Sequence, residues 1–280
     1  MASSVRQVGD EMAYPPLFTI AYLVHSDVPL LRRTVPATLD ALCRNTKHDY
    51  DLVLVVDGAE VAPIDEIQAL AHDTWGFDEV RVRWRDRHRA SGDQANNIHT
   101  HLSLTKSRFL ITVEGDVAAF RSDASTDLLD AIARTFNACP GLALAQRIDD
   151  HDCWQWALEE VGAPLMPGVR SVNRVSSHFL IYDTYRARQV IETAGGIPGD
   201  AFHDDGTHWF NYEDWLSRTF AQPQGPGIGY LDQLPLRVYH CDEKTSPGSA
   251  HYRRDLATRL AVFERRATET ARSSGEDTLA

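Results

Sequence analysis

Two acidic residues flank a glycine at the end of a short apolar run, in the order Glu114-Gly115-Asp116. The residues before them read RFLITV, and a β-branched, aromatic run of this length predicts a buried strand. Carboxylates at the point where a strand leaves an open α/β sheet lie beside the crevice in which such sheets bind ligands. Two acids at this spacing can converge on one hard cation, and the glycine lets a phosphate approach the backbone closely. The triplet alone also fits a solvated turn, so the surrounding elements have to distinguish the two readings.

The composition indicates a globular protein with an acidic surface. The 280 residues are 43% hydrophobic and 24% charged, and the formal net charge is −12. This balance argues against nucleic-acid binding, which depends on neutralising phosphates, but leaves room for a nucleotide held by a local cation. No apolar stretch approaches the roughly 20 residues that span a bilayer, and the four cysteines form no CxxC. We therefore expect a cytoplasmic, reduced chain without an integral membrane segment.

The first half of the chain alternates between strand and helix patterns. We expect strands at residues 17–24, 51–56, 80–85 and 108–114. Helices at residues 29–42, 64–71 and 91–105 connect them. Such alternation predicts a parallel, doubly wound α/β sheet with right-handed crossovers. Asp27, Asp57 and the Glu114/Asp116 pair each follow one of these strands, so they should meet at one edge of the sheet.

The second half is less regular. We expect helices at residues 126–137, 185–194, 213–220 and 250–272. Strands are expected at 142–146, 179–182 and 236–239, and loops at 148–174 and 222–229. The last helix carries Leu256, Leu260 and Phe263 on one side. We expect this side to pack on its own domain, although such a helix can also mediate a dimer, so a monomer and a homodimer both stay open.

Four sequence pieces occur in the order in which a known family has them. They are TIAYLVHSD at 19–27, VLVVDG at 53–58, VEGD at 113–116, and Gly195-Gly196 followed by YEDWLSR at 212–218. In this order the sequence resembles glycosyltransferases of the GT-A fold, most like the family 2 members, over about Phe18 to His240. The third piece is similar to the family's DxD motif, with Glu114 in the first position. The chain has no P-loop, no HExxH and no GxGxxG that opens a helix.

The resemblance implies an α/β, GT-A architecture, which is Rossmann-like with a mainly parallel central sheet and helices on both faces. We expect a mobile leader at 1–14, a nucleotide-sugar-binding half at 15–120, an acceptor-binding and catalytic half at 121–249, and a C-terminal helix and tail at 250–280.

The resemblance also assigns expected roles around the donor. The expected donor-binding residues are Val24, His25 and Ser26 in the first nucleotide-contacting turn, Asp57 at the base, Gly92 in the segment before the acidic strand, and Glu114 and Gly115 of the acidic triplet. Independently of the resemblance, Arg89, or else Arg87 or His88, is expected to reach the diphosphate, because these residues follow the strand at 80–85 at its crevice end. Asp116 is the expected ligand of a divalent cation, Mn²⁺ or Mg²⁺, with Glu114 at the ribose or the metal shell. His240 ends a late strand and is a candidate third metal ligand, although a lone histidine there can also be structural.

Asp214 is the expected catalytic base, with Glu213 as the alternative. Acids at the start of a helix are also stabilised by the helix dipole, so simple capping is the competing interpretation. An ionised carboxylate at this position suits a base that takes a proton from an acceptor hydroxyl. One base opposite the leaving group implies a single displacement with inversion.

The expected activity is therefore sugar transfer from a nucleotide-sugar donor, with a UDP-sugar favoured, to a hydroxyl of a small-molecule or glycan acceptor by a hexosyltransferase-type enzyme. Two alternatives stay open. A nucleotidyltransferase shares the architecture but carries a glycine-rich loop with Arg and Lys after its first strand, where this chain has His25, Ser26 and Asp27. A non-catalytic nucleotide- or carbohydrate-binding protein would keep the sheet without metal dependence.

Overall fold

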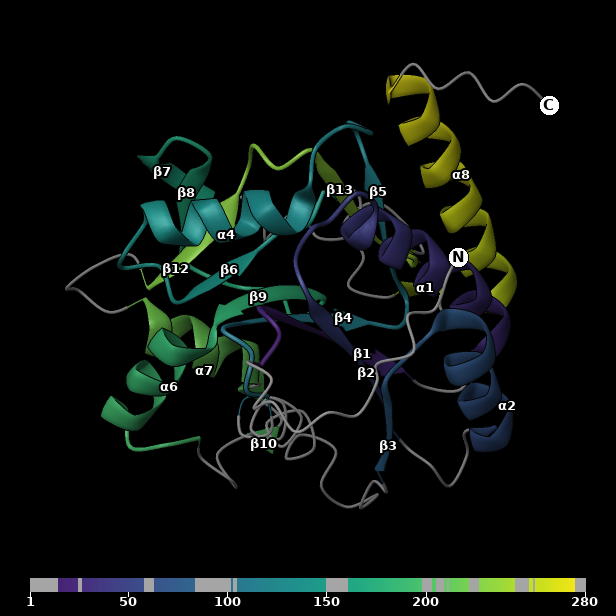
Figure 1. The fold of residues 1–280 in the computed structure, drawn as a ribbon, viewed down its shortest axis with the longest axis horizontal. Coiled ribbons are helices and arrows are strands. Elements are labelled where there is room, and N and C mark those ends of the chain that lie inside the picture. The colour runs from purple at the N-terminus through teal and green to yellow at the C-terminus, as the bar shows by residue number, and fades with distance from the viewer. Residues whose placement is uncertain are drawn as a thin grey trace.

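A nine-stranded sheet forms the centre of the molecule, in the order β3-β2-β1-β4-β9-β6-β12-β8-β7 (Figure 1). The structure is a computed structural model that describes residues 15–24, 27–57, 63–83, 102, 105–149, 161–197, 203–204, 209–210, 212–221, 227–244, 252–253 and 255–274. The strands of this sheet are β1 (Phe18–Val24), β2 (Tyr50–Asp57), β3 (Glu79–Arg83), β4 (Phe109–Glu114), β6 (Leu144–Gln146), β7 (Val161–Met166), β8 (Val169–Val172), β9 (Phe179–Asp183) and β12 (Ile228–Leu231).

The predicted parallel half of the sheet is confirmed. β1 pairs in parallel with β2 and β4, and β2 pairs in parallel with β3. The register places Val24 beside Val56 and Leu23 beside Glu114, so the carboxyl ends of β1, β2 and β4 lie along one edge. The acids that follow these strands are therefore brought to the same side of the molecule.

The other half of the sheet is mixed. β9 is antiparallel to both β4 and β6, β12 is parallel to β6, and the β7–β8 hairpin closes the sheet in antiparallel pairing. From these pairings, β9 and β8 run against the other strands of the sheet. The central sheet is thus mostly parallel, as expected.

Helices cover both faces of the sheet (Figure 1). Their bounds are α1 (Val28–Cys43), α2 (Ile64–Ala69) with a π-helical turn at Leu70–Trp75, α4 (Leu128–Ala138), α6 (Thr184–Thr193), α7 (Tyr212–Phe220) and α8 (Leu256–Ser274). Val35 of α1 and Phe136 of α4 belong to one buried cluster, whereas Ile191 of α6 and Phe220 of α7 belong to the cluster on the other face. Successive side chains of each strand point to opposite faces, which is why the continuously apolar strands supply both clusters.

Three pairs of short strands lie outside the large sheet. Two of them are β10 (His203–Asp204) with β11 (Trp209–Phe210), and β14 (Glu243–Lys244) with β15 (Tyr252–Arg253). The third is an antiparallel ribbon of β5 (Val117–Arg121) and β13 (Leu236–His240). This ribbon begins directly after Asp116 and ends at His240, so it joins two residues that are far apart in the sequence.

The C-terminal helix packs on its own domain, as its apolar side predicted. Phe263 of α8 shares a buried cluster with Leu30 of α1, Ala118 of β5 and Cys241. Leu256 and Leu260 lie partly buried against the same cluster. No helix within the described ranges combines the length and the apolar composition needed to cross a bilayer.

Two expected loops contain strands instead. The expected loop at 148–174 includes the whole β7–β8 hairpin, and the expected loop at 222–229 runs into β12. Most of β7 is exposed at the edge of the sheet and includes Pro164, so its sequence lacks the alternation of a half-buried strand. β12 has only four residues, too few to show a period. The strand β5 was not expected either, because the acidic turn before it reads as the end of an element.

Candidate metal centre and active site

A tight turn and one strand pairing create the centre of the candidate site. β4 ends at Glu114, Gly115 and Asp116 form the turn, and β5 starts at Val117. Val117 lies opposite His240 in the β5–β13 ribbon, and the Cys241 amide donates to the Asp116 carbonyl at 2.8 Å. The ribbon therefore places Asp116 beside the residues at the end of β13.

Three side chains converge there: Asp116, His240 and Asp242. Their potential ligand atoms all lie within 4.8 Å of one another. His240 Nε2 is 3.2 Å from Asp116 Oδ2 and 3.6 Å from Asp242 Oδ2. Asp242 is fully buried, whereas the Asp116 side chain retains 22% exposure and so remains open to a ligand.

The donor chemistry of this group fits a divalent cation. Carboxylate oxygens suit both Mg²⁺ and Mn²⁺, and an imidazole nitrogen is acceptable to Mn²⁺. Asp116 and His240 were expected in this role, but Asp242 was not. Its signal in the sequence is the two-residue spacing from His240, which repeats the spacing of Glu114 and Asp116. We refer to Asp116, His240 and Asp242 together as the acid–histidine cluster.

The protonation of the cluster follows from its charges. Burial alone would raise the pKa of Asp116, but the neighbouring His240 and the guanidinium of Arg259 hold that pKa well below its usual range. Burial alone would lower the pKa of His240, but Asp116 and Asp242 raise it above its usual value. Burial and the neighbouring His240 lower the pKa of His178 to about 4, so this second imidazole is neutral at pH 7.

Arg259 of α8 also contacts the cluster, and nothing in the sequence indicated this. Its Nη2 lies 2.8 Å from Asp116 Oδ2 and its Nε lies 2.8 Å from Asp242 Oδ1, while Nη1 pairs with Asp27 after β1. One guanidinium thus joins three acids from three separate parts of the chain. The arginine is 9% exposed.

Glu114 lies beside the cluster rather than in it. Its Oε1 accepts a hydrogen bond from Ser177 Oγ at 2.6 Å, and its Oε2 is 4.0 Å from His178 Nδ1. The His178 ring in turn lies against the His240 ring, with 4.3 Å between centroids. Among the described residues, Glu114 is therefore linked to the metal candidates through His178.

Gly115 allows two backbones to approach each other. Its amide donates to the Leu23 carbonyl at 2.8 Å, and its carbonyl accepts from Thr34 Oγ1 at 2.7 Å. A Cβ at this position would lie 2.7 Å from Leu31 Cδ2 and 3.3 Å from Val24 Cα. The close approach seen here is to β1 and α1, and contact with a phosphate stays a prediction.

The two acids at the start of α7 have different surroundings. Glu213 is 8% exposed and accepts from the Ser177 amide at 2.6 Å. Asp214 pairs with Arg174, with Oδ1 and Nη2 3.3 Å apart, and its side chain keeps 22% exposure. Ser177 therefore connects Glu213 to Glu114, while Asp214 is the more accessible of the two carboxylates.

The other expected donor-binding residues are only partly within the described structure. Val24 is buried at the end of β1, and Asp57 is the last residue of β2 at the same edge. His25, Ser26, Arg89 and Gly92 lie outside the described residues.

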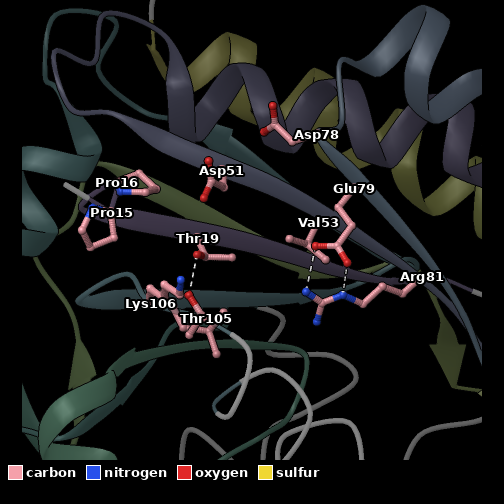
Figure 2. Close-up of a pocket in the computed structure, with 11 residues that line it drawn as sticks. Pro15, Pro16, Thr19, Asp51, Val53, Asp78, Glu79, Arg81, Thr105 and Lys106 are labelled. Atoms are coloured by element: carbon pink, nitrogen blue, oxygen red, sulfur yellow. Dashed lines mark hydrogen bonds and ion pairs between the residues drawn. The ribbon is translucent and has the colours of Figure 1, made fainter. Parts of the chain in front are cut away.

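A separate cavity lies at the opposite ends of the same strands (Figure 2). It has a volume of about 440 Å³ and is lined by residues including Thr19 of β1, Asp51 of β2 and Lys106. Thr19 precedes Val24 by five positions, which corresponds to roughly 16 Å along a strand. The cavity is therefore distinct from the edge that carries the acid–histidine cluster.

Neither a family model nor a curated protein sequence matches the chain, but solved structures do. One is GalNAc-T7 with UDP, GalNAc and Mn²⁺, with a TM-score of 0.51 and 12% identity over 80% of this chain and 44% of that chain. Another is the mannosyltransferase PcManGT from Pyrobaculum calidifontis in complex with GDP-Man and Mn²⁺, with a TM-score of 0.42 and 13% identity over 78% of this chain and 57% of that one. The chain thus spans about half the length of these solved chains.

At these identities the likeness concerns the fold. The match to GalNAc-T7 covers most of this chain, and the mostly parallel sheet with helices on both faces agrees with it. The acidic turn after β4 lies at the carboxyl edge of the parallel strands, where the alternation of strands and helices predicted it. The chain has the GT-A fold of glycosyltransferases.

Proposed function

We propose that this protein is a metal-dependent glycosyltransferase that moves a sugar from a nucleotide diphosphate donor to a hydroxyl of a small acceptor. The observation that carries the proposal is the acid–histidine cluster at the carboxyl edge of a GT-A sheet. The solved GalNAc-T7 structure that shares this fold contains UDP and Mn²⁺. We favour a UDP-sugar as the donor and a single displacement with inversion.

Asp116, His240 and Asp242 would hold a divalent cation, Mn²⁺ or Mg²⁺. When bound, this cation supplies charge neutralisation for the departing diphosphate. Asp116 is the most exposed of the three side chains, so it would face the donor phosphates. The buried Asp242 would bind the cation from the protein interior. The neutral His178 supports this arrangement because it adds no positive charge beside His240.

The donor would lie across the carboxyl ends of β1, β2 and β4. Asp57 is proposed to bond the base, and the turn after Val24 to contact the nucleotide. Ser177 orients Glu114 through a 2.6 Å hydrogen bond, which would direct that carboxylate toward the ribose. Arg89 keeps its proposed role near the diphosphate, and Gly92 its proposed role in donor binding.

Asp214 is the proposed base that removes the proton of the acceptor hydroxyl as it attacks. Its side chain is accessible, and the ion pair with Arg174 orients it. Glu213 is less suited because it is buried and already accepts from the Ser177 amide.

Thermal unfolding in the presence of UDP and MnCl₂ tests donor binding. With ligand near 100 times its Kd, we expect Tm to rise by about 5 °C, since ligand binding stabilises only the folded state. Asp116→Asn should abolish the dependence on Mn²⁺, whereas Asp65→Asn, an exposed acid of α2, should keep it. An equal rise for Asp116→Asn would show that the cation does not bind at Asp116.

Turnover is measured by incubating the protein with Mn²⁺ and a panel of nucleotide sugars and following the release of the nucleotide diphosphate. We expect one donor to be hydrolysed faster than the others, because in the absence of an acceptor the sugar is transferred slowly to water. Tight nucleotide binding without hydrolysis of any donor would favour a binding protein over an enzyme.

A further inference from the structure

The guanidinium of Arg259 occupies the position at which a cation would be expected among the acids. It contacts Asp116 and Asp242 at 2.8 Å each and pairs with Asp27 as well. Three carboxylates gathered this closely repel one another unless a positive charge lies between them. In the structure, the C-terminal helix supplies that charge.

Arg259 and a divalent cation would use the same oxygen. Asp116 Oδ2 accepts from Arg259 Nη2 at 2.8 Å and lies 3.2 Å from His240 Nε2. That oxygen faces the other ligand candidates, so a cation bound among them would contact it directly. A guanidinium and a divalent cation on one carboxylate oxygen repel each other, and the repulsion is strong at a site as buried as this one.

The side chain can leave without moving its helix. Phe263 and Val262 lie one turn further along α8 and are buried, so packing fixes the helix independently of Arg259. Asp255 accepts from the Thr258 amide and hydroxyl, which fixes the start of the helix as well. The Asp27 side chain is 41% exposed and offers the guanidinium a partner outside the buried acids.

We propose that Arg259 is the resident cation of the acid–histidine cluster and that a divalent cation binds there by displacing its guanidinium from Asp116 and Asp242. The proposal rests on the proposed metal site. It makes Arg259, a residue of the C-terminal helix, the one that sets the cation affinity of the cluster.

Mn²⁺ affinity tests the proposal directly, by electron paramagnetic resonance of free Mn²⁺ in titrations of the protein without donor. Arg259→Gln should bind Mn²⁺ on the order of tenfold more tightly than the wild type, because no competing charge remains. Arg259→Lys, which keeps the charge but loses the planar fork, should fall between them. Arg265→Gln, which removes an exposed charge from the same helix, should match the wild type.

The wild-type protein provides a second readout that needs no substituted chain to fold. The Arg259 Nε–H resonance, identified by its absence in Arg259→Lys, is followed by NMR during titration with diamagnetic Mg²⁺. Displacement from Asp242 should shift the resonance or remove it through faster exchange with solvent. An unchanged resonance at Mg²⁺ saturation would contradict the proposal.

The outcomes separate this proposal from the one on which it rests. If Asp116→Asn abolishes Mn²⁺ binding but Arg259→Gln binds as the wild type does, or more weakly, the metal site stands and displacement is wrong. If neither the wild type nor Arg259→Gln binds Mn²⁺ at millimolar concentration, the metal site itself is wrong and displacement falls with it.

Discussion

At the scale of single residues, burial separates acids that look alike in the sequence. Asp116 and Asp242 both face His240, but only Asp116 retains exposure toward solvent. Glu213 and Asp214 are neighbours in the chain, yet one is bonded to a buried amide and the other to a half-exposed arginine. These differences decide which carboxylate can meet a ligand and which one supports its neighbours.

Asp242→Asn keeps the shape of the side chain and removes one charge from the cluster. We expect Mn²⁺ affinity to fall by about 10–100-fold or more, because an amide oxygen is a weaker ligand than a carboxylate. Titration with Mn²⁺ detected by paramagnetic resonance measures this. Asp232→Asn, an exposed acid after β12, is the control and should bind as the wild type does. Unchanged affinity in Asp242→Asn would remove this residue from the metal site.

Asp214→Asn removes the proposed base. We expect kcat for sugar transfer to fall by about 10²–10⁴-fold while KM for the donor changes little, because the base acts on the acceptor proton. Glu213→Ala should instead lower the free energy of unfolding by about 1–3 kcal/mol, since it leaves the buried Ser177 amide without its carboxylate. If Glu213→Ala abolishes turnover and Asp214→Asn does not, the two roles are exchanged.

Gly115→Ala tests the close approach of the acidic turn to β1. The added Cβ would lie 2.7 Å from Leu31 Cδ2, closer than packed carbon atoms allow. We expect the free energy of unfolding in urea to fall by about 1–3 kcal/mol through overpacking. Leu31→Ala in the same chain should recover part of this loss relative to the sum of the single changes. Strict additivity of the two effects would show that the contact is not the cause.

At the scale of elements, the site depends on the position of β13, which carries His240. One edge of this strand pairs with β5, and a buried aspartate holds the other. Asp149 accepts from the Val238 amide at 2.9 Å, and its own amide donates to the Val238 carbonyl at 2.7 Å. Arg147 pairs with the same carboxylate inside the protein. β13 is therefore fixed between β5 and the segment that follows β6.

Asp149→Ala should lower the free energy of unfolding by about 3–5 kcal/mol. The change leaves the guanidinium of Arg147 buried without its carboxylate and removes the acceptor of the Val238 amide. Urea unfolding followed by tryptophan fluorescence measures the effect, with Asp130→Ala on α4 as a control for a half-exposed acid. A loss below 1 kcal/mol would mean that the buried pair contributes little to the position of β13.

At the scale of the whole molecule, the C-terminal helix packs beside the candidate site. α8 packs against α1 and β5, and β5 directly follows the acidic turn, so the apolar side of α8 contacts the same elements that position this turn. Arg259 lies on the same helix, close to the buried Phe263. The packing of Phe263 therefore fixes the part of α8 from which the Arg259 side chain extends.

Phe263→Ala should lower the free energy of unfolding by about 3 kcal/mol, because it leaves a cavity between α8, α1 and β5. Leu165→Ala, at an exposed leucine of β7, should stay within about 0.5 kcal/mol of the wild type. Both are measured by denaturant unfolding under the same conditions. Equal effects of the two changes would mean that the packing of α8 does not stabilise the domain.

The sequence by itself determined the parallel half of the sheet and the edge at which its acids meet. Its signals are local: continuous apolar runs, helices between them, and acids directly after the strands, as at Asp27 and Asp116. The strands β7, β8 and β12 escaped prediction because they are too short or too exposed to show a period, and β5 because the acidic turn before it reads as the end of an element.

The composition of the candidate site was decided by the tertiary structure. Asp116 meets His240 across 124 positions and Arg259 across 143, through a strand pairing and a helix contact that leave no local pattern. Asp242 and Arg259 are single polar residues whose roles depend on what is packed beside them. Which charges are buried together is a property of the packed chain, so the full set of groups around the cation site could be read only from the fold.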